Sequence, residues 1–322
     1  MSFPLAIVIF EVFVTITSTG VFITLFLRKS WLDLVTLGGA SIFGVTLEFC
    51  NVLFFETYHY NVLFLLQIGI PPQNIPLSIG LAWGLIIYSS MIISDSKNLS
   101  NHVRPFMDAT LALTIDLSMD AIAIRLDGGF WTWFVPLTTS LDEVSFFGVP
   151  YGNFYGWWMV VFIFSNFVRY GRGLWANSKK IGACFFGITP FLSYIPLYFS
   201  LEMIRETAIL LLGFGFYSDW DQAIYFNTLY LAILLMIIGI LIPIFAWKCE
   251  KKDFFTNEIY DTVTAPIIPR VTFLGFHLIF FFLGTLYQIW FELPLILILS
   301  LLFFSFHIYL SSHESYEISR KI

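Results

Sequence analysis

Nine apolar runs, each long enough to cross the hydrocarbon core of a bilayer, follow one another along the chain. Backbone in lipid must satisfy its own hydrogen bonds, so runs of this length form helices. The chain is 58% hydrophobic and 12% charged, with a mean hydropathy of +0.83, which is far more apolar than a soluble domain. We therefore predict an all-α, polytopic transmembrane helical bundle of about nine helices. The predicted spans are residues 4–27, 32–55, 76–94, 106–126, 154–170, 181–213, 224–247, 271–290 and 292–310.

Charge in the connections predicts how these helices cross the membrane. The sixth run is longer than one span and contains Pro190 and Pro196, which fits either one kinked helix or two shorter passes. With nine crossings every basic connection falls on one side, and a tenth crossing would break this alternation. The positive-inside rule then places the N-terminus outside and the C-terminus in the cytoplasm of a multi-pass protein of the cell membrane. The chain has no internal repeat or linker, so we expect a single domain, residues 1–322.

The fourth run carries carboxylates that need a physical explanation. Asp116 and Asp120 are four residues apart and share a helical face, and Asp108 lies in the same broad sector. Because ionised carboxylates are costly in lipid, this face must line a polar cavity, pair with other groups or keep its protons. Two neighbouring carboxylates at low dielectric should not both ionise, so at least one of Asp116 and Asp120 should stay protonated near neutral pH. The plainer alternative is that these aspartates only hydrogen-bond neighbouring helices.

Polar residues from four predicted helices share one depth, near the middle or in the outer half of the membrane. One polar chamber explains their shared depth better than unrelated placements would, because burying each polar side chain alone in the membrane would cost free energy. His277 and His307, nearer the cytoplasmic ends, are predicted to be ordinary interfacial histidines. Two outer segments, 56–75 and 127–153, are predicted either to cover the chamber or to anchor at the headgroups. The predicted chamber residues are Glu11, Glu48, Asn51, Asp116, Asp120, Glu202, Arg205 and Glu206.

Several function classes lack their usual sequence signals. The net charge of −6 is spread over short loops and gives no argument for a nucleic-acid partner. Cys50, Cys184 and Cys249 are isolated, so neither disulfides nor a Cys/His metal site is expected. The sequence has no HExxH, P-loop, GxGxxG, GxSxG or DDxxD motif. Acids and aromatic residues around an apolar interior remain. They suit protonation of a carbon–carbon double bond, with the cation stabilised by carboxylate charge and aromatic faces and then quenched by water.

A set of motifs lies within residues 30–170. They are Glu48, Tyr58-His-Tyr60, Pro76 to Trp83 with Tyr88, Asp116-x-x-x-Asp120 leading into AIAIRL, Trp131-Thr-Trp133, Phe146 to Pro150, and Asn153-Phe-Tyr-Gly-Trp157. In this combination the chain resembles the integral-membrane carotenoid biosynthesis proteins, a family that includes carotenoid hydratases such as bisanhydrobacterioruberin hydratase and γ-carotene 1′-hydratase. One departure is Ala121, where the family commonly has a proline after the second aspartate.

The resemblance implies a carotenoid hydratase, a cofactor-independent hydro-lyase that adds water to the terminal isoprenoid double bond of a linear or monocyclic carotenoid. We predict Asp116 or Asp120 as the general acid, with the other aspartate and Glu48 stabilising the tertiary cation. A cyclase or isomerase, and a transporter or carotenoid-binding protein, remain alternatives. The expected partners are the carotenoid substrate, membrane lipid and other carotenoid-pathway enzymes. The predicted substrate-binding residues are Trp83, Trp131, Trp133, Asn153, Trp157, Tyr58, Tyr60 and Arg205.

Overall fold

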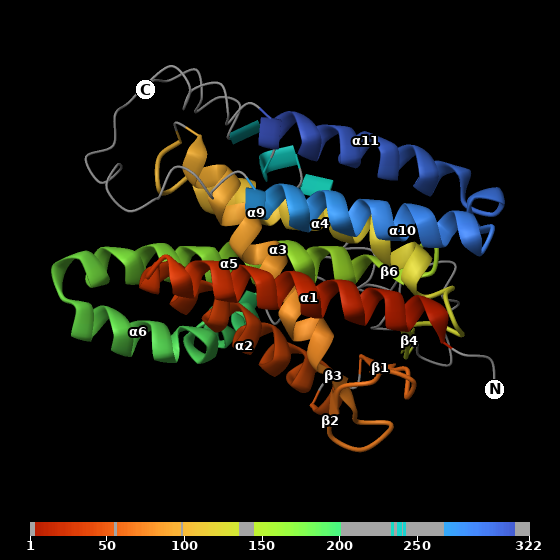
Figure 1. The fold of residues 1–322 in the computed structure, drawn as a ribbon, viewed down its shortest axis with the longest axis horizontal. Helices are drawn as coiled ribbons and strands as arrows, with labels where there is room; N and C mark the ends of the chain where they lie inside the picture. The colour runs from red at the N-terminus through yellow and green to blue at the C-terminus, as the bar shows by residue number, and fades with distance from the viewer. Residues whose placement is uncertain are drawn as a thin grey trace, which may run out of the picture.

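The computed structural model describes residues 4–54, 57–97, 99–134, 145–200, 233–234, 237–239, 241–242 and 267–312. Apart from three short two-stranded sheets, the elements in these ranges are helices, as the sequence predicts (Figure 1). The long helices are α1 (Leu5–Leu27), α2 (Trp31–Leu53), α3 (Leu77–Ser96), α4 (Arg104–Ala123), α5 (Tyr151–Asn177), α6 (Lys179–Leu192), α10 (Gly275–Leu286) and α11 (Pro294–Ser312). The short helical elements are α9 (Ile267–Pro269), the π-helical turn η2 (Arg270–Leu274) and the 3₁₀ turn η3 (Ile289–Phe291).

Six helical segments of the described residues are long and apolar enough to cross a membrane. Helices α4 and α5 fall outside this set, and α4 carries the buried aspartates that lower its hydropathy. The predicted long run that begins at 181 is helical from Lys179 to Ser200, with a turn at Ser193, three residues after Pro190. This part of the run is therefore one helical segment interrupted at a single residue. The rest of that run, and nearly all of the predicted span 224–247, lie outside the described residues.

Helices α3 and α4 occupy the centre of the bundle. Helix α3 packs against α1, α2, α4 and α5, and 89% of its most apolar 18-residue window is buried. Helix α4 packs against α3, α5, α10 and α11. The α2–α3 crossing is especially close, because a methyl group at Gly84 of α3 would overlap the Ser41 hydroxyl of α2. Small residues at the contact let the two backbones approach, as in other membrane helix pairs.

The three sheets gather at one end of the bundle, where α2 and α4 end and α3 and α5 begin (Figure 1). Strand β1 (Tyr58–Tyr60) pairs antiparallel with β4 (Trp131–Trp133), β2 (Gln67–Ile68) with β3 (Ile75–Pro76), and β5 (Ser145–Phe146) with β6 (Val149–Pro150). Proline ends β3 and β6 and stands directly before α3 and α5, where its fixed φ suits the start of a helix. The basic connections 28–30 and 97–103 lie at the opposite end, which agrees with the predicted alternation of charge.

The loop after α4 ties α1 into the bundle through Asp127. Its Oδ2 accepts hydrogen bonds from the backbone N–H groups of Ala6 (2.7 Å) and Ile7 (3.2 Å), and thereby caps the first turn of α1. Its Oδ1 accepts one from the Tyr287 hydroxyl at 2.6 Å. Asp127 has a φ of +52°, a left-handed conformation that aspartate and asparagine adopt more readily than most residues. One carboxylate thus joins α1, the α4–β4 loop and the end of α10.

Candidate functional site

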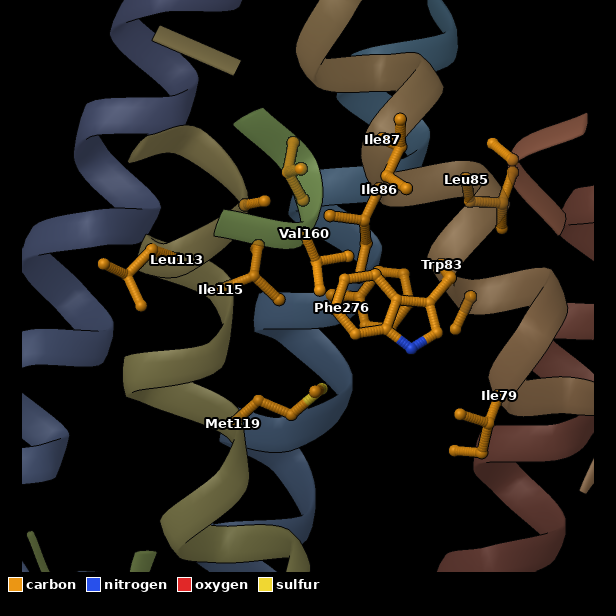
Figure 2. Packing of buried hydrophobic residues seen from close by; sticks show 14 of the residues in the cluster. Ile79, Trp83, Leu85, Ile86, Ile87, Leu113, Ile115, Met119, Val160 and Phe276 are labelled. Atoms are coloured by element: carbon orange, nitrogen blue, oxygen red, sulfur yellow. The ribbon is translucent and has the colours of Figure 1, made fainter. Parts of the chain in front are cut away.

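A cavity of about 330 Å³ lies between α2, α3, α4 and α5, beneath the β1–β4 pair. Figure 2 shows Trp83 of α3, Met119 of α4 and Val160 of α5 projecting toward a common space, and all three line this cavity. Its wall is mostly apolar and aromatic, with two carboxyl groups, from Glu48 and Asp120. Its other aromatic lining residues are Phe10, Tyr58, Tyr60, Phe130, Trp131, Trp133, Phe134, Trp157 and Phe280.

Glu48 of α2 is buried and accepts hydrogen bonds from three side chains. Trp83 Nε1 donates to Oε1 at 2.7 Å, Tyr60 donates to Oε2 at 2.6 Å, and the Tyr58 hydroxyl donates to the same Oε2. The close α2–α3 crossing sets Trp83 opposite Glu48, and Trp83 also stacks on Trp157 of α5 with ring centroids 4.0 Å apart. The carboxyl group is therefore held in one orientation from α3 and from β1.

Cross-strand pairing arranges four aromatic residues over Glu48. Tyr58 lies opposite Trp133, and Tyr60 lies opposite Trp131. Alternate residues of a strand share a face, so all four side chains lie on the same face of the pair. Burial, followed by the charge of Glu48, raises the pKa of both tyrosines well above the usual value of 10. The two hydroxyl groups therefore stay protonated and remain donors at any ordinary pH.

Asp116 and Asp120 of α4 meet the side chain of Asn153 on α5. Asn153 Nδ2 lies 3.0 Å from Asp116 Oδ2 and 2.9 Å from Asp120 Oδ2. Both carboxyl groups accept from the same amide and so lie close together, and at low dielectric two neighbouring carboxylates should not both ionise. Asp120 lines the cavity, whereas Asp116 lies behind it and is fully buried. The aspartates thus form a carboxyl pair, with one member at the cavity wall.

A tight hairpin sets Asn153 beside the aspartates. Phe147 and Gly148 link β5 to β6, and both have positive φ, at +52° and +83°, as a type I′ turn requires. Arg125, just beyond α4, donates from Nη1 to the carbonyl of Phe147 at 2.9 Å and to that of Ala121 at 2.7 Å. The guanidinium therefore fixes the hairpin, and with it the start of α5, against the end of α4.

Asp108 belongs to a different cluster. It lies twelve residues, roughly 18 Å of helix, before Asp120. Its Oδ2 pairs with Arg169 Nη2 of α5 at 2.7 Å, and Arg169 also pairs with Asp95, which in turn pairs with Arg172 at 2.6 Å. The shared helical sector predicted for the three aspartates therefore does not make one site. Asp108 is part of a buried ion-pair network at the basic end of the bundle.

Two more sequence predictions are corrected by side-chain contacts. His277 and His307 are not exposed at an interface, because both are buried within the bundle and His277 Nε2 lies 2.8 Å from His307 Nδ1. Glu11 does not line the cavity, since its Oε2 accepts the backbone N–H of Leu65 at 2.7 Å and so holds the loop after β1. Burial between α4, α10 and α11 accounts for the histidine pair, and no hydropathy pattern distinguishes it from an interfacial pair.

The structure brings most of the predicted site residues to one cavity. Arg205, Glu202 and Glu206 lie outside the described residues. Among the described residues, no group of three or more His, Cys, Asp or Glu side chains is arranged to hold a metal ion. The predicted residues that line the cavity are Glu48, Asn51, Tyr58, Tyr60, Trp83, Asp120, Trp131, Trp133, Asn153 and Trp157. Sequence reasoning missed Phe10, Phe130 and Phe280, which look like any other core phenylalanine in the sequence.

Fold and site together define a multi-pass helical membrane protein with an aromatic, acid-bearing cavity. The chain matches the sequence profile of the carotenoid biosynthesis proteins over residues 3–218, and it belongs to this family. The match extends at both ends beyond the 30–170 segment that carries the motif resemblance, and it includes every described residue of the cavity except Phe280. No curated protein and no solved structure matches the chain.

Proposed function

We propose that the protein is a carotenoid hydratase that adds water to a terminal isoprenoid double bond by acid catalysis. The observation that carries the proposal is the Asp116–Asp120 carboxyl pair, which shares the Asn153 amide at the wall of an aromatic cavity that also contains Glu48. Membership of the carotenoid biosynthesis family gives the substrate class. The activity itself is our inference from these groups and their chemistry.

Asp120 is the proposed general acid. Its Oδ1 is buried and receives no hydrogen bond from any residue that the structure describes, and Asp120 lines the cavity while Asp116 does not. The neighbouring Asp116 carboxyl and the apolar surroundings both disfavour a second negative charge, so a proton is retained for transfer. Asp120 delivers that proton to the less substituted carbon of the double bond, and the electron pair of the π bond forms the new C–H bond. The positive charge then lies on the tertiary carbon.

Glu48 is the proposed stabilising charge. Three donors converge on its carboxylate, and hydrogen bonds to the charged form favour that form. A carboxylate fixed before the reaction stabilises a developing cation without reorganisation. The faces of Trp83 and Trp157 add the quadrupole attraction of aromatic rings for a cation. Water then forms the C–O bond, and its released proton returns to the Asp116–Asp120 pair, so that atoms and charge balance over one turnover.

The size of the cavity supports action at one end of the substrate. A volume of about 330 Å³ is at the lower limit for ligand pockets, so it takes one terminus of a long polyene. The remaining length of the substrate then lies toward the bilayer. Both ends of a symmetric carotenoid react in this scheme only by successive binding events.

Pigment mass tests this proposal directly. The wild-type chain is expressed in a host that accumulates lycopene. The Trp290→Phe variant is expressed beside it as a control outside the site, because Trp290 does not line the cavity. A hydratase produces a mass gain of one water per reacted end, and in deuterated water one deuterium becomes bound to carbon. A cyclase or isomerase leaves the mass unchanged while altering retention, and a transporter or binding protein leaves the pigment unaltered. Either of the last two results would overturn the proposal.

A further inference from the structure

Two indole N–H groups of residues that line the cavity have no hydrogen-bond partner among the described residues. They belong to Trp131 and Trp133, and both Nε1 atoms are buried. By contrast, Trp83 Nε1 reaches Glu48 at 2.7 Å and Trp290 Nε1 reaches Thr285 Oγ1 at 3.0 Å. A buried donor without a partner costs about 1–3 kcal/mol, so two in succession on one strand call for an explanation.

The β1–β4 pair places both indoles on the same wall of the cavity. Trp131 and Trp133 are alternate residues of β4 and so lie on the same face, with ring centroids 6.5 Å apart. Their cross-strand neighbours on that face, Tyr60 and Tyr58, donate hydrogen bonds from their hydroxyl groups to Glu48. The tyrosines are therefore committed to an acceptor of the protein, and the indoles are the donors of this wall that stay available.

We propose that the indole N–H groups of Trp131 and Trp133 form a binding site for the hydroxyl oxygen of a ligand. This deepens the proposed function and rests on it: the oxygen is that of the tertiary alcohol product. An alcohol oxygen has two lone pairs and so accepts from both indoles, while its own proton is donated to a carboxylate of the cavity. A hydrocarbon terminus offers no acceptor and leaves both donors unpaired.

The site therefore makes the cavity prefer a terminus that carries a hydroxyl over the same terminus without it. A site built to hydrogen-bond an OH discriminates against the analogue that lacks it, because its own buried groups are then left unpaired. We expect each indole to contribute about fivefold to the affinity for the alcohol, which is the size of an ordinary net hydrogen bond. The affinity for the alkene should be the same with or without the N–H groups.

The experiment uses the full chain in detergent with ¹⁵N-labelled tryptophan, and it observes the indole N–H resonances. Trp131→Phe and Trp133→Phe each delete one resonance and so assign it, and Trp290→Phe assigns a control outside the cavity. Myrcenol, a tertiary alcohol, and myrcene, the alkene of the same carbon skeleton, are the two probes. We expect myrcenol to move the two assigned resonances downfield and myrcene to leave them near their free positions, with Trp290 unchanged by both.

Equal shifts with the two probes, or none with myrcenol, would overturn the hydroxyl site. If either Phe variant fails to fold, selective reverse labelling assigns the wild-type resonances and the titration still decides. The readout is binding, so it also separates this inference from the reaction. If the indole resonances shift with myrcenol but the protein never hydrates lycopene, the oxygen site stands and the hydratase proposal fails. If the protein hydrates lycopene but the resonances do not shift, only the oxygen site fails.

Discussion

Gly84→Ala should loosen the α2–α3 crossing that sets Trp83 against Glu48. An added methyl group would overlap Ser41 Oγ and would also lie 3.1 Å from its Cβ and 3.2 Å from its Cα. Rotating the hydroxyl away gives up its 3.0 Å bond to the Leu37 carbonyl and still leaves the Cα and Cβ contacts. The helices must therefore separate by several tenths of an ångström, and overpacking of this kind costs about 1–3 kcal/mol.

The consequence for the site follows from the 2.7 Å bond between Trp83 Nε1 and Glu48, which a shift of about 0.5 Å weakens. Thermal unfolding in detergent should rank Gly84→Ala below wild type, and pigment conversion at a permissive temperature should fall with it. Gly20→Ala is the matched control, since an added methyl there meets nothing within 4 Å. Ser41→Ala in the Gly84→Ala background removes the overlapping hydroxyl and should restore part of the loss. Equal stability and full conversion in Gly84→Ala would refute this reasoning.

Three further substitutions have defined outcomes. Tyr58→Phe removes one donor from Glu48 and should lower pigment conversion while the protein still folds, as judged by size-exclusion profile; unchanged conversion would argue against a fixed carboxylate. Asp127→Ala removes the cap of α1 and should lower the free energy of unfolding by about 1 kcal/mol, as measured by thermal unfolding. Asp127→Asn should lower it less, because an acceptor remains, and equal losses of stability in the two variants would contradict the capping role. Arg169→Met leaves the charge of the buried Asp108 uncompensated and should lower the free energy of unfolding by about 3–5 kcal/mol. Adding Asp108→Asn should recover part of this loss, and an Arg169→Met variant as stable as wild type would contradict the ion-pair assignment.

The helices could be predicted from the sequence because their cause is local. A run of about twenty apolar residues has few alternatives to a helix, so α1, α2 and α3 begin and end within a few residues of the predicted spans. The strands were beyond prediction for the opposite reason. Strand β1 has three residues and pairs with β4 some seventy residues later, and nothing near either segment specifies that partner.

The same contrast holds within the candidate site. The aspartate spacing alone placed Asp116 and Asp120 on one face, and the contact with Asn153 agrees with it. The spacing could not separate Asp108 from them, because helical periodicity gives the angle around the axis and not the neighbouring element. Antiparallel packing of α4 and α5 makes that separation, setting Asn153 beside Asp120 and Arg169 beside Asp108. The role of Trp83 likewise depends on the close approach at Gly84.

The central claim is that the Asp116–Asp120 pair supplies the proton, and pigment hydration by the two asparagine variants tests it most directly. Asparagine keeps the shape and a hydrogen-bonding oxygen but has no titratable proton. Each variant is expressed beside wild type in the lycopene-producing host, and folded protein is quantified by its size-exclusion profile. The account predicts that Asp120→Asn folds and yields no hydrated pigment, and that Asp116→Asn hydrates far more slowly than wild type. Near-full hydration by both folded variants would contradict the account.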